Sequence, residues 1–280
     1  MKLETYTDLS EKEKVFKSKG YLKIDTVANF ENWYGHFSKE KKFFRGVNEA
    51  KYKIYTSAQR KYITNDLRLS GKTVEDIIDD ELSQVKSFNN NLLKNYFELL
   101  NVDDFDPLYL SFLQHYSGIS PLIDFTVNIN IALYFMQDSC CFAKAGSEDI
   151  DNYTSLYYML DESESTSAQT YDVRKIRQIT SFSSMRKETE PIIFGSQKYN
   201  FGKIRLCLAN LNLIAQEGRF VFYCNDIKPL EENIYCVDIH KSLAPYIKKK
   251  LDEKGITKDS IYPQEEIIAK KALQRALENI

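Results

Sequence analysis

An arginine stands inside a short apolar run of this chain, where its side chain needs a chemical partner. Arg45 follows Phe44 and precedes Gly46 within residues 42–47, a run that predicts a short strand. A buried guanidinium must pair with an acid, a carbonyl or a ligand phosphate, because leaving it unpaired costs several kcal/mol. An internal salt bridge and a phosphate site are both open at this point. Gly46 would let another backbone or a ligand approach closely.

Three further segments place polar side chains beside apolar ones. They are Gln114-His115-Tyr116 at the end of an expected helix, Asp124-Phe125-Thr126 before another, and Gln216-Glu217 before an expected strand. Each segment has a structural alternative: a packed or capping histidine, a helix cap at Asp124 or Thr126, and a tight turn at Gln216-Glu217. Their co-occurrence, rather than any one of them, favours a functional site.

Helical periodicity dominates the first half of the sequence. Residues 9–41 predict one or two helices, and residues 73–100 repeat apolar side chains as a long amphipathic helix does. Pro107 is expected to open a helix that runs through His115, and another short helix is expected over residues 129–136. Later helices are expected over residues 242–253, stopped by Gly255, and over residues 263–278.

Strands and a polar stretch occupy the second half. Residues 146–184 are rich in Ser, Thr, Asp and Glu and predict a surface insertion with one strand near residues 156–159. Further strands are expected at residues 203–208, 219–224 and 234–239. Because helices come first and strands later, the pattern predicts an α+β fold. We expect N-terminal and central helices packed on a mainly antiparallel sheet, and not a doubly wound sheet.

Composition excludes several classes of protein. The chain has 38 basic and 40 acidic residues, a balance that argues against a protein held permanently on duplex DNA. Five cysteines without a CxxC pair, together with three histidines, argue against a disulfide framework and a metal site. No stretch approaches the roughly 18 apolar residues of a membrane span, and the N-terminus lacks an apolar signal core. We therefore expect a cytoplasmic protein with no membrane partner.

The segments with candidate functional residues resemble a known family. Phe44-Arg45-Gly46 is the tripeptide that names the FRG domain, and residues 112–116, 122–126 and 132–135 look like its central signature. Residues 212–220 and 255–263 are similar to its C-terminal blocks. The resemblance implies an FRG domain over residues 42–280, preceded by an N-terminal helical segment over residues 1–41.

The order of these landmarks is also similar to that of ADP-ribosyltransferases with an Arg, Ser-Thr-Ser, Glu pattern. This resemblance implies an ADP-ribosyltransferase-like fold with NAD⁺ as co-substrate. Arg45 and Gly46 would hold the pyrophosphate. Glu217, with Asp124 as the second choice, would stabilise the cation that forms when the nicotinamide–ribose bond breaks.

The remaining contacts to NAD⁺ follow from the same resemblance. Tyr116, Phe125 and Tyr134 are candidates to stack on the nicotinamide ring. His115 would hydrogen-bond the ribose or a phosphate. Thr126 and Gln216 complete the expected binding residues.

Functions from different classes stay open at the level of sequence. The first is an enzyme that transfers ADP-ribose to RNA, DNA or protein, which the resemblance places among bacterial toxins or phage-defence effectors, where an antitoxin would be a partner. The second is a non-catalytic nucleotide- or nucleic-acid-binding module, suggested by cations interleaved with rings at residues 51–55 and 60–62. A third is an adaptor whose acidic insertion engages a protein. A solvated amphipathic face explains residues 51–62 equally well.

Overall fold

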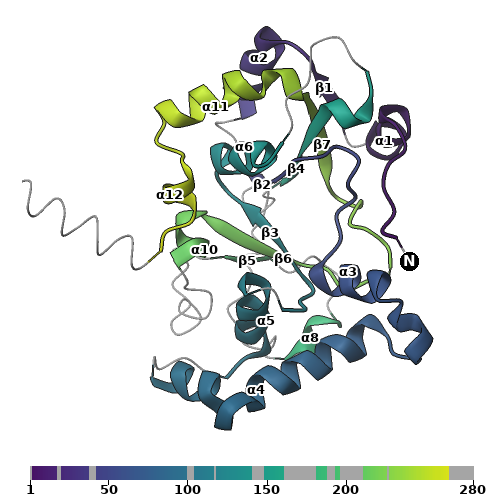
Figure 1. Cartoon of the computed structure of the whole chain (residues 1–280), viewed down its shortest axis with the longest axis vertical. Helices are drawn as coiled ribbons and strands as arrows, with labels where there is room; N and C mark the ends of the chain where they lie inside the picture. The colour runs from purple at the N-terminus through teal and green to yellow at the C-terminus, as the bar shows by residue number, and fades with distance from the viewer. Residues whose placement is uncertain are drawn as a thin grey trace, which may run out of the picture.

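The computed structural model describes residues 2–17, 20–37, 42–99, 104–116, 118–140, 148–160, 181–187, 193–195, 211–225 and 227–264. Within these ranges the chain has an α+β fold built on one open, mostly antiparallel sheet (Figure 1). The strand expected at residues 203–208, and all but the first two residues of the helix expected over 263–278, lie outside the described residues.

The sheet takes strands from both ends of the described chain. Its strands are β1 (Leu22–Ile24), β2 (Lys42–Val47), β3 (Leu122–Thr126), β4 (Tyr153–Leu160), β5 (Ile193–Gly195), β6 (Gly218–Phe222) and β7 (Tyr235–His240). They lie side by side in the order β1-β7-β4-β2-β3-β6-β5. The β1–β7 pair is parallel and the others are antiparallel.

Helices surround this sheet, and most of them form two groups. They are α1 (Leu9–Phe16), α2 (Val27–Phe37), α3 (Ser57–Thr64), α4 (Val74–Leu99), α5 (Asp106–His115), α6 (Ile129–Gln137), α8 (Phe182–Met185), α10 (Leu211–Ala215), α11 (Ala244–Glu253) and α12 (Lys258–Ile261). Single 3₁₀ turns occupy Leu67–Ser70, Ile150–Asn152 and Lys241–Leu243. Figure 1 shows α2, α6 and α11 around one half of the sheet and α3, α4, α5 and α8 around the other. None of the described helices has the length and apolar character needed to cross a bilayer.

The polar insertion expected over residues 146–184 is in fact partly core, which corrects that expectation. β4 lies inside the sheet between β2 and β7, and its alternate side chains are buried on both faces. Leu156 packs with the α2–α6–α11 cluster, whereas Tyr157 packs with residues of α1. Phe182 of α8 is fully buried against α4 and α5. Residues 161–180 of the expected insertion lie outside the described residues.

The described residues of the N-terminal segment, 2–17 and 20–37, contribute to the same sheet and core. The helical pattern expected over residues 9–41 resolves into α1 and α2, separated by β1, a strand that the sequence analysis missed. Phe16 and Phe30 are completely buried in different core clusters. A three-residue strand is too short to show a period of two, so the surrounding helical pattern hides it.

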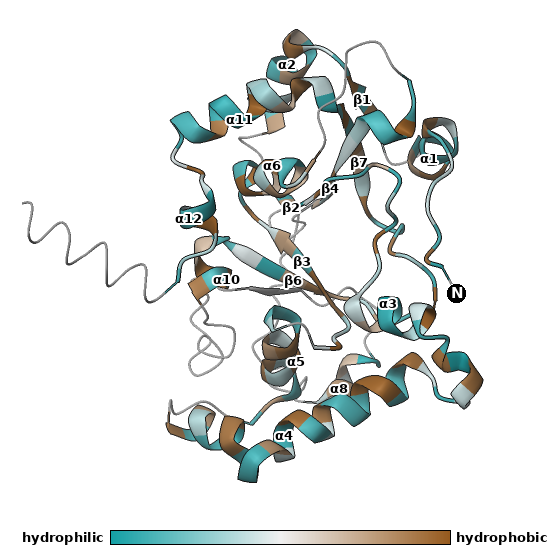
Figure 2. Ribbon diagram, viewed as in Figure 1, coloured by the Kyte–Doolittle hydropathy of each residue, from teal (hydrophilic) through white to brown (hydrophobic). Residues whose placement is uncertain are grey.

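The long helix expected over residues 73–100 is confirmed as α4, but it is broken within. Asn89, Asn90 and Asn91 have φ between +45° and +61°, the left-handed region that asparagine tolerates better than most residues. Before the break, Val74, Ile78 and Leu82 are buried, as expected. After it, Leu92, Tyr96 and Leu99 are exposed, so the apolar face predicted from periodicity does not all reach the core. Figure 2 shows hydrophobic segments along the length of α4.

The other predicted elements are confirmed within a few residues. β2, α5 and α6 match residues 42–47, 107–115 and 129–136, and β6 and β7 match residues 219–224 and 234–239. Gly255 follows α11 with a φ of +72°, as expected for a glycine that stops a helix.

Candidate functional site

A cavity opens where the two halves of the sheet separate. β2 and β3 pair through one register position, Phe44 with Thr126, and diverge beyond it. The cavity at this gap has a volume of about 790 Å³. Its walls come from β2 and β3, the end of α5, α3 and the segment before it, the end of α6, and the short segments around Glu4, Gln216 and Tyr262.

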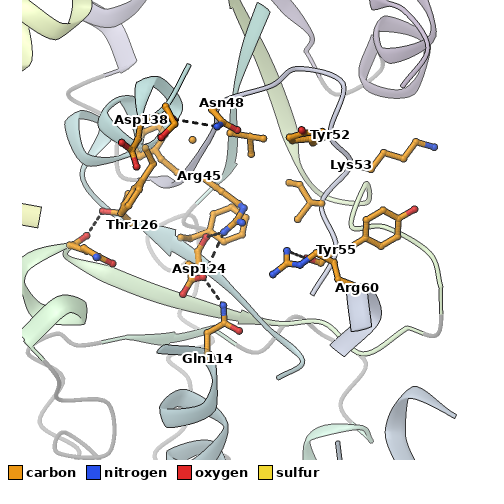
Figure 3. Close-up of a pocket in the computed structure, with 18 of the residues that line it drawn as sticks. Arg45, Asn48, Tyr52, Lys53, Tyr55, Arg60, Gln114, Asp124, Thr126 and Asp138 are labelled. Carbon is orange, nitrogen blue, oxygen red and sulfur yellow. Dashed lines mark hydrogen bonds and ion pairs between the residues drawn. The ribbon is translucent and has the colours of Figure 1, made fainter. Parts of the chain in front are cut away.

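Arg45 crosses the gap between these strands. Its Nη1 donates to the backbone oxygen of Asp124 at 2.7 Å and lies 3.9 Å from the Asp124 carboxylate (Figure 3). The two side chains are 24% and 48% exposed, so both are accessible from the cavity. Arg45 Nε is buried with no hydrogen-bond partner among the described residues. Burial lowers the pKa of Arg45, and the charge of Asp124 partly opposes this effect.

The end of α5 supports the same carboxylate. Gln114 Nε2 donates to Asp124 Oδ2 at 2.7 Å, so the Asp124 carboxylate is oriented from α5 as well as from β2. His115 also lines the cavity and packs edge-on against Phe220, with a ring-centroid distance of 5.2 Å. Burial lowers the pKa of His115 despite the nearby Asp124, so the site favours the neutral imidazole. Its Nε2 atom is buried without a hydrogen-bond partner in the described part of the chain.

Gly46 lines the cavity, but its small size serves the packing of α6. A Cβ atom at this position would lie 1.9 Å from the backbone oxygen of Ala132 and 2.6 Å from the Met136 nitrogen. The sequence leaves open whether another backbone or a ligand approaches Gly46. The structure shows that the backbone of α6 does.

Thr126 and Gln216 lie together at one side of the cavity. The Thr126 hydroxyl donates to the Gln216 backbone oxygen at 2.7 Å and accepts from the Asn128 backbone nitrogen at 3.0 Å. Helix α6 is capped by Asn128, whose side chain accepts from the Asn130 backbone nitrogen, so the alternative of a cap at Asp124 or Thr126 is wrong. Phe125 lines the cavity as well, although it is only 4% exposed.

Glu217 does not line the cavity, even though its neighbour Gln216 does. Its carboxylate accepts a hydrogen bond of 2.7 Å from Asn128 Nδ2. Its φ of +46° places it in the tight turn before β6 that the sequence analysis weighed as the structural alternative. The predicted meeting of Glu217 with Arg45 in one cleft is thus not observed, and the carboxylate that faces Arg45 is Asp124.

Two of the predicted stacking residues also lie outside the cavity lining. Tyr116 is 66% exposed and packs against Phe112 at 4.7 Å between ring centroids. Tyr134 is half-buried on α6 and contacts Phe135 edge-on. The rings that do line the cavity, apart from Phe125, belong to Phe44, Tyr52, Tyr55, Phe135 and Tyr262.

Sequence reasoning also missed cationic residues of the site. Arg60 and Lys53 line the cavity from α3 and the segment before it (Figure 3). Both belong to the basic and aromatic residues 51–62, which the sequence analysis assigned to nucleic-acid binding or to a solvated face. Lys51 of that run points elsewhere and pairs with Asp151 at 2.7 Å. The described residues hold no cluster of three or more His, Cys, Asp or Glu side chains suited to a metal ion.

Comparison with known proteins gives one match. Residues 40–142 match the FRG domain family, a span that includes Arg45, Gln114, His115 and Asp124 of the cavity. Neither the curated proteins nor the solved structures contain a match to the chain.

Proposed function

We propose that this chain is an NAD-dependent ADP-ribosyltransferase whose substrate binds in the cavity between β2 and β3. One observation carries the proposal: the partly exposed side chain of Arg45 and the half-exposed Asp124 carboxylate lie together in the cavity. A guanidinium fork suits a phosphate, and a carboxylate suits the positive charge that develops on a ribose when its glycosidic bond breaks.

The size and lining of the cavity support a ligand of nucleotide dimensions. Its volume of about 790 Å³ lies within the range of roughly 300–1,000 Å³ that ligand pockets occupy. Phe135 and Tyr262, whose rings lie 6.0 Å apart, line one side of it and offer apolar surface to a flat heterocycle. These rings take the role that the sequence analysis gave to Tyr116 and Tyr134.

In the proposed reaction the bond between ribose C1′ and the nicotinamide nitrogen breaks, and its electron pair leaves with nicotinamide. Asp124 stabilises the resulting charge on the ribose. A nucleophilic group of the acceptor then bonds to C1′ and releases a proton. His115 lines the same cavity, and burial favours its neutral imidazole, so it can accept that proton.

The acceptor is RNA, DNA or protein in this proposal, and the setting is a bacterial toxin or a phage-defence effector. Tyr52 and Lys53 at the cavity are suited to a nucleic-acid acceptor, since Tyr52 is 45% exposed and can stack on a base. They also support the second candidate, a module that binds a nucleotide without cleaving it.

The test compares two isosteric changes from acid to amide. Purified protein is incubated with NAD⁺ and with cellular RNA, DNA or lysate, and nicotinamide release is measured by chromatography. Asp124→Asn should lower the rate by about 10²-fold or more, because one charge that stabilises the transition state is lost. Glu217→Gln is the matched control and should leave the rate within a few-fold of the parent, because Glu217 lies outside the cavity.

The results of this experiment distinguish Asp124 from Glu217 as the catalytic carboxylate, and an enzyme from a binding module. Loss of activity in Glu217→Gln with retention in Asp124→Asn would restore the assignment made from sequence. Binding of NAD⁺ without nicotinamide release from the parent protein would favour the non-catalytic module. Absence of both binding and release would overturn the proposed function.

A further inference from the structure

A second guanidinium reaches the cavity from a different part of the fold. Arg60 lies on α3, whereas Arg45 lies on β2, and both side chains line the same cavity (Figure 3). The side chain of Arg60 is anchored by its Nη1, which donates to the backbone oxygen of Tyr55 at 2.9 Å. Among the described residues no other group accepts a hydrogen bond from this guanidinium, so its remaining donors can bind a ligand.

The charges around the two arginines do not balance locally. Among the described residues, Asp124 lies within ion-pair distance of Arg45, and no carboxylate lies within that distance of Arg60. Lys53, the other cation of the cavity wall, is already paired with Glu4 at 3.3 Å. Asp138 also lines the cavity, but it lies beside Asn48, on the far side of Arg45 from Arg60 (Figure 3).

The positive charges of the two guanidinium groups repel each other. Loss of hydration and the positive charge of Arg45 both lower the pKa of Arg60, and Asp124 opposes them. Like charges held together in a cavity raise the free energy of the unliganded protein, and an anion that contacts both removes this cost. A diphosphate bridge offers one charged phosphate group to each guanidinium, so it is a better ligand for the pair than a single phosphate group.

We propose that Arg45 and Arg60 together bind the diphosphate bridge of a nucleotide ligand, so that the site selects diphosphate-containing molecules over monophosphates. The inference deepens the proposed function, and rests on it only in placing the ligand in this cavity. It names the group of the ligand that is recognised and assigns Arg60 a role in specificity. Planar guanidinium groups suit this task because each presents two parallel N–H bonds to phosphate oxygens.

The experiment measures the discrimination between ADP and AMP, and between pyrophosphate and phosphate, by titration calorimetry. The parent protein should bind ADP and pyrophosphate at least tenfold more tightly than AMP and phosphate, since a hydrogen bond to a charged group contributes about 1.5–3 kcal/mol. Arg60→Gln should remove most of this difference. It should lower the affinity for ADP about tenfold or more and change the affinity for AMP less than about threefold. Arg60→Lys keeps the charge but not the fork and should recover only part of the discrimination.

Arg68→Gln is the matched control. Arg68 is 43% exposed, lies in the 3₁₀ turn after α3 and does not line the cavity, so its loss should leave both affinities unchanged. Circular dichroism and thermal denaturation establish that each variant is folded before titration.

The possible results separate this inference from the proposed function. The diphosphate assignment is overturned if the Arg60→Gln variant binds ADP as tightly as the parent, or if its affinities for ADP and AMP fall by the same factor. This holds even if the protein cleaves NAD⁺. If the Arg60-dependent discrimination is present and NAD⁺ is not cleaved, the diphosphate site stands and the transferase proposal falls. If the parent protein binds neither ADP nor pyrophosphate, the inference fails outright.

Discussion

Arg45 connects two strands at the place where their backbones separate. Its Nη1 donates to the Asp124 carbonyl, which takes the place of a backbone hydrogen bond beyond the single β2–β3 register pair. The same side chain is 24% exposed and lines the cavity. A substitution of Arg45 would therefore affect both the sheet and ligand binding, whereas substitutions of Asp124 and Arg60 test the cavity without removing this link between the strands.

Adding a single carbon atom at Gly46 tests how closely α6 packs against β2. Gly46→Ala should destabilise the protein by about 1–3 kcal/mol or more, because the added Cβ would overlap the α6 backbone at Ala132. The free energy of unfolding is measured by urea denaturation. Gly35→Ala is the control, since Gly35 lies in α2 with no atom within 4 Å of an added Cβ, and it should stabilise the protein by about 0.5–1 kcal/mol. Equal effects at the two glycines would contradict the close approach of α6 to β2.

His115 makes stability depend on pH. Burial lowers the pKa of His115 below its usual 6.5, so the unfolded chain binds a proton at pH values where the folded chain does not. The contribution of neutral His115 is therefore complete above pH 6.5 and is lost as the pH falls towards the folded pKa. Between pH 7.5 and pH 5.5, the parent should lose more unfolding free energy than His115→Gln does. An identical loss in both proteins would show that His115 does not titrate differently in the folded state.

At the scale of elements, a buried lysine attaches α1 to the sheet. Lys12 is fully buried, and its Nζ donates to the Ala50 backbone oxygen, to Ser155 of β4 and, at 2.7 Å, to Asp238 of β7. Asp238 in turn accepts a hydrogen bond from Tyr21 at 2.8 Å. All three ammonium donors are satisfied, so the network fixes the position of the helix on the sheet.

Removal of one partner of this network should be costly. Lys12→Met should lower the free energy of unfolding by about 3–5 kcal/mol, because it leaves the Asp238 carboxylate buried without its cation. The double variant Lys12→Met/Asp238→Asn should recover part of the loss. Lys14→Met, at an exposed position on the same helix, should change stability by less than about 0.5 kcal/mol. A similar loss in both single variants would argue against the buried ion pair.

The same network explains why the sequence misled about β4. Thr154 and Ser155 are polar, yet both are buried, since Thr154 donates to the Ile239 backbone oxygen and Ser155 to Asp238. Because β4 carries such polar residues and lies next to a polar stretch, its sequence predicts an exposed strand at the surface. Its central position depends on hydrogen-bond partners more than 80 residues away in the chain, which no local pattern reveals.

At the scale of the whole molecule, the sequence predicts single helices and strands better than it predicts how they pack together. Local signals predicted α5, α6 and β2, such as Pro107 at the first turn of α5 and the apolar run of β2, because these signals lie in neighbouring residues. The sequence analysis placed Arg45 and Asp124 at the same expected site, but it gave Glu217 as the first choice for the carboxylate and Asp124 as the second. The contribution of Arg60 to the cavity, and the exclusion of Glu217 from it, depend on how α3 and β6 pack against β2 and β3, and no spacing in the sequence encodes that arrangement.

The parallel pairing of β1 with β7 has a consequence for how the chain is made. A ribosome releases residues 22–24 more than 200 residues before residues 235–240, yet β7 must enter between β1 and β4 for the sheet to be completed. Until then the nascent polypeptide carries a β4 edge with nothing on one side, the kind of edge that recruits chaperones or joins another unfinished copy. Translation that stops before residue 235 would leave a fragment with this edge permanently open.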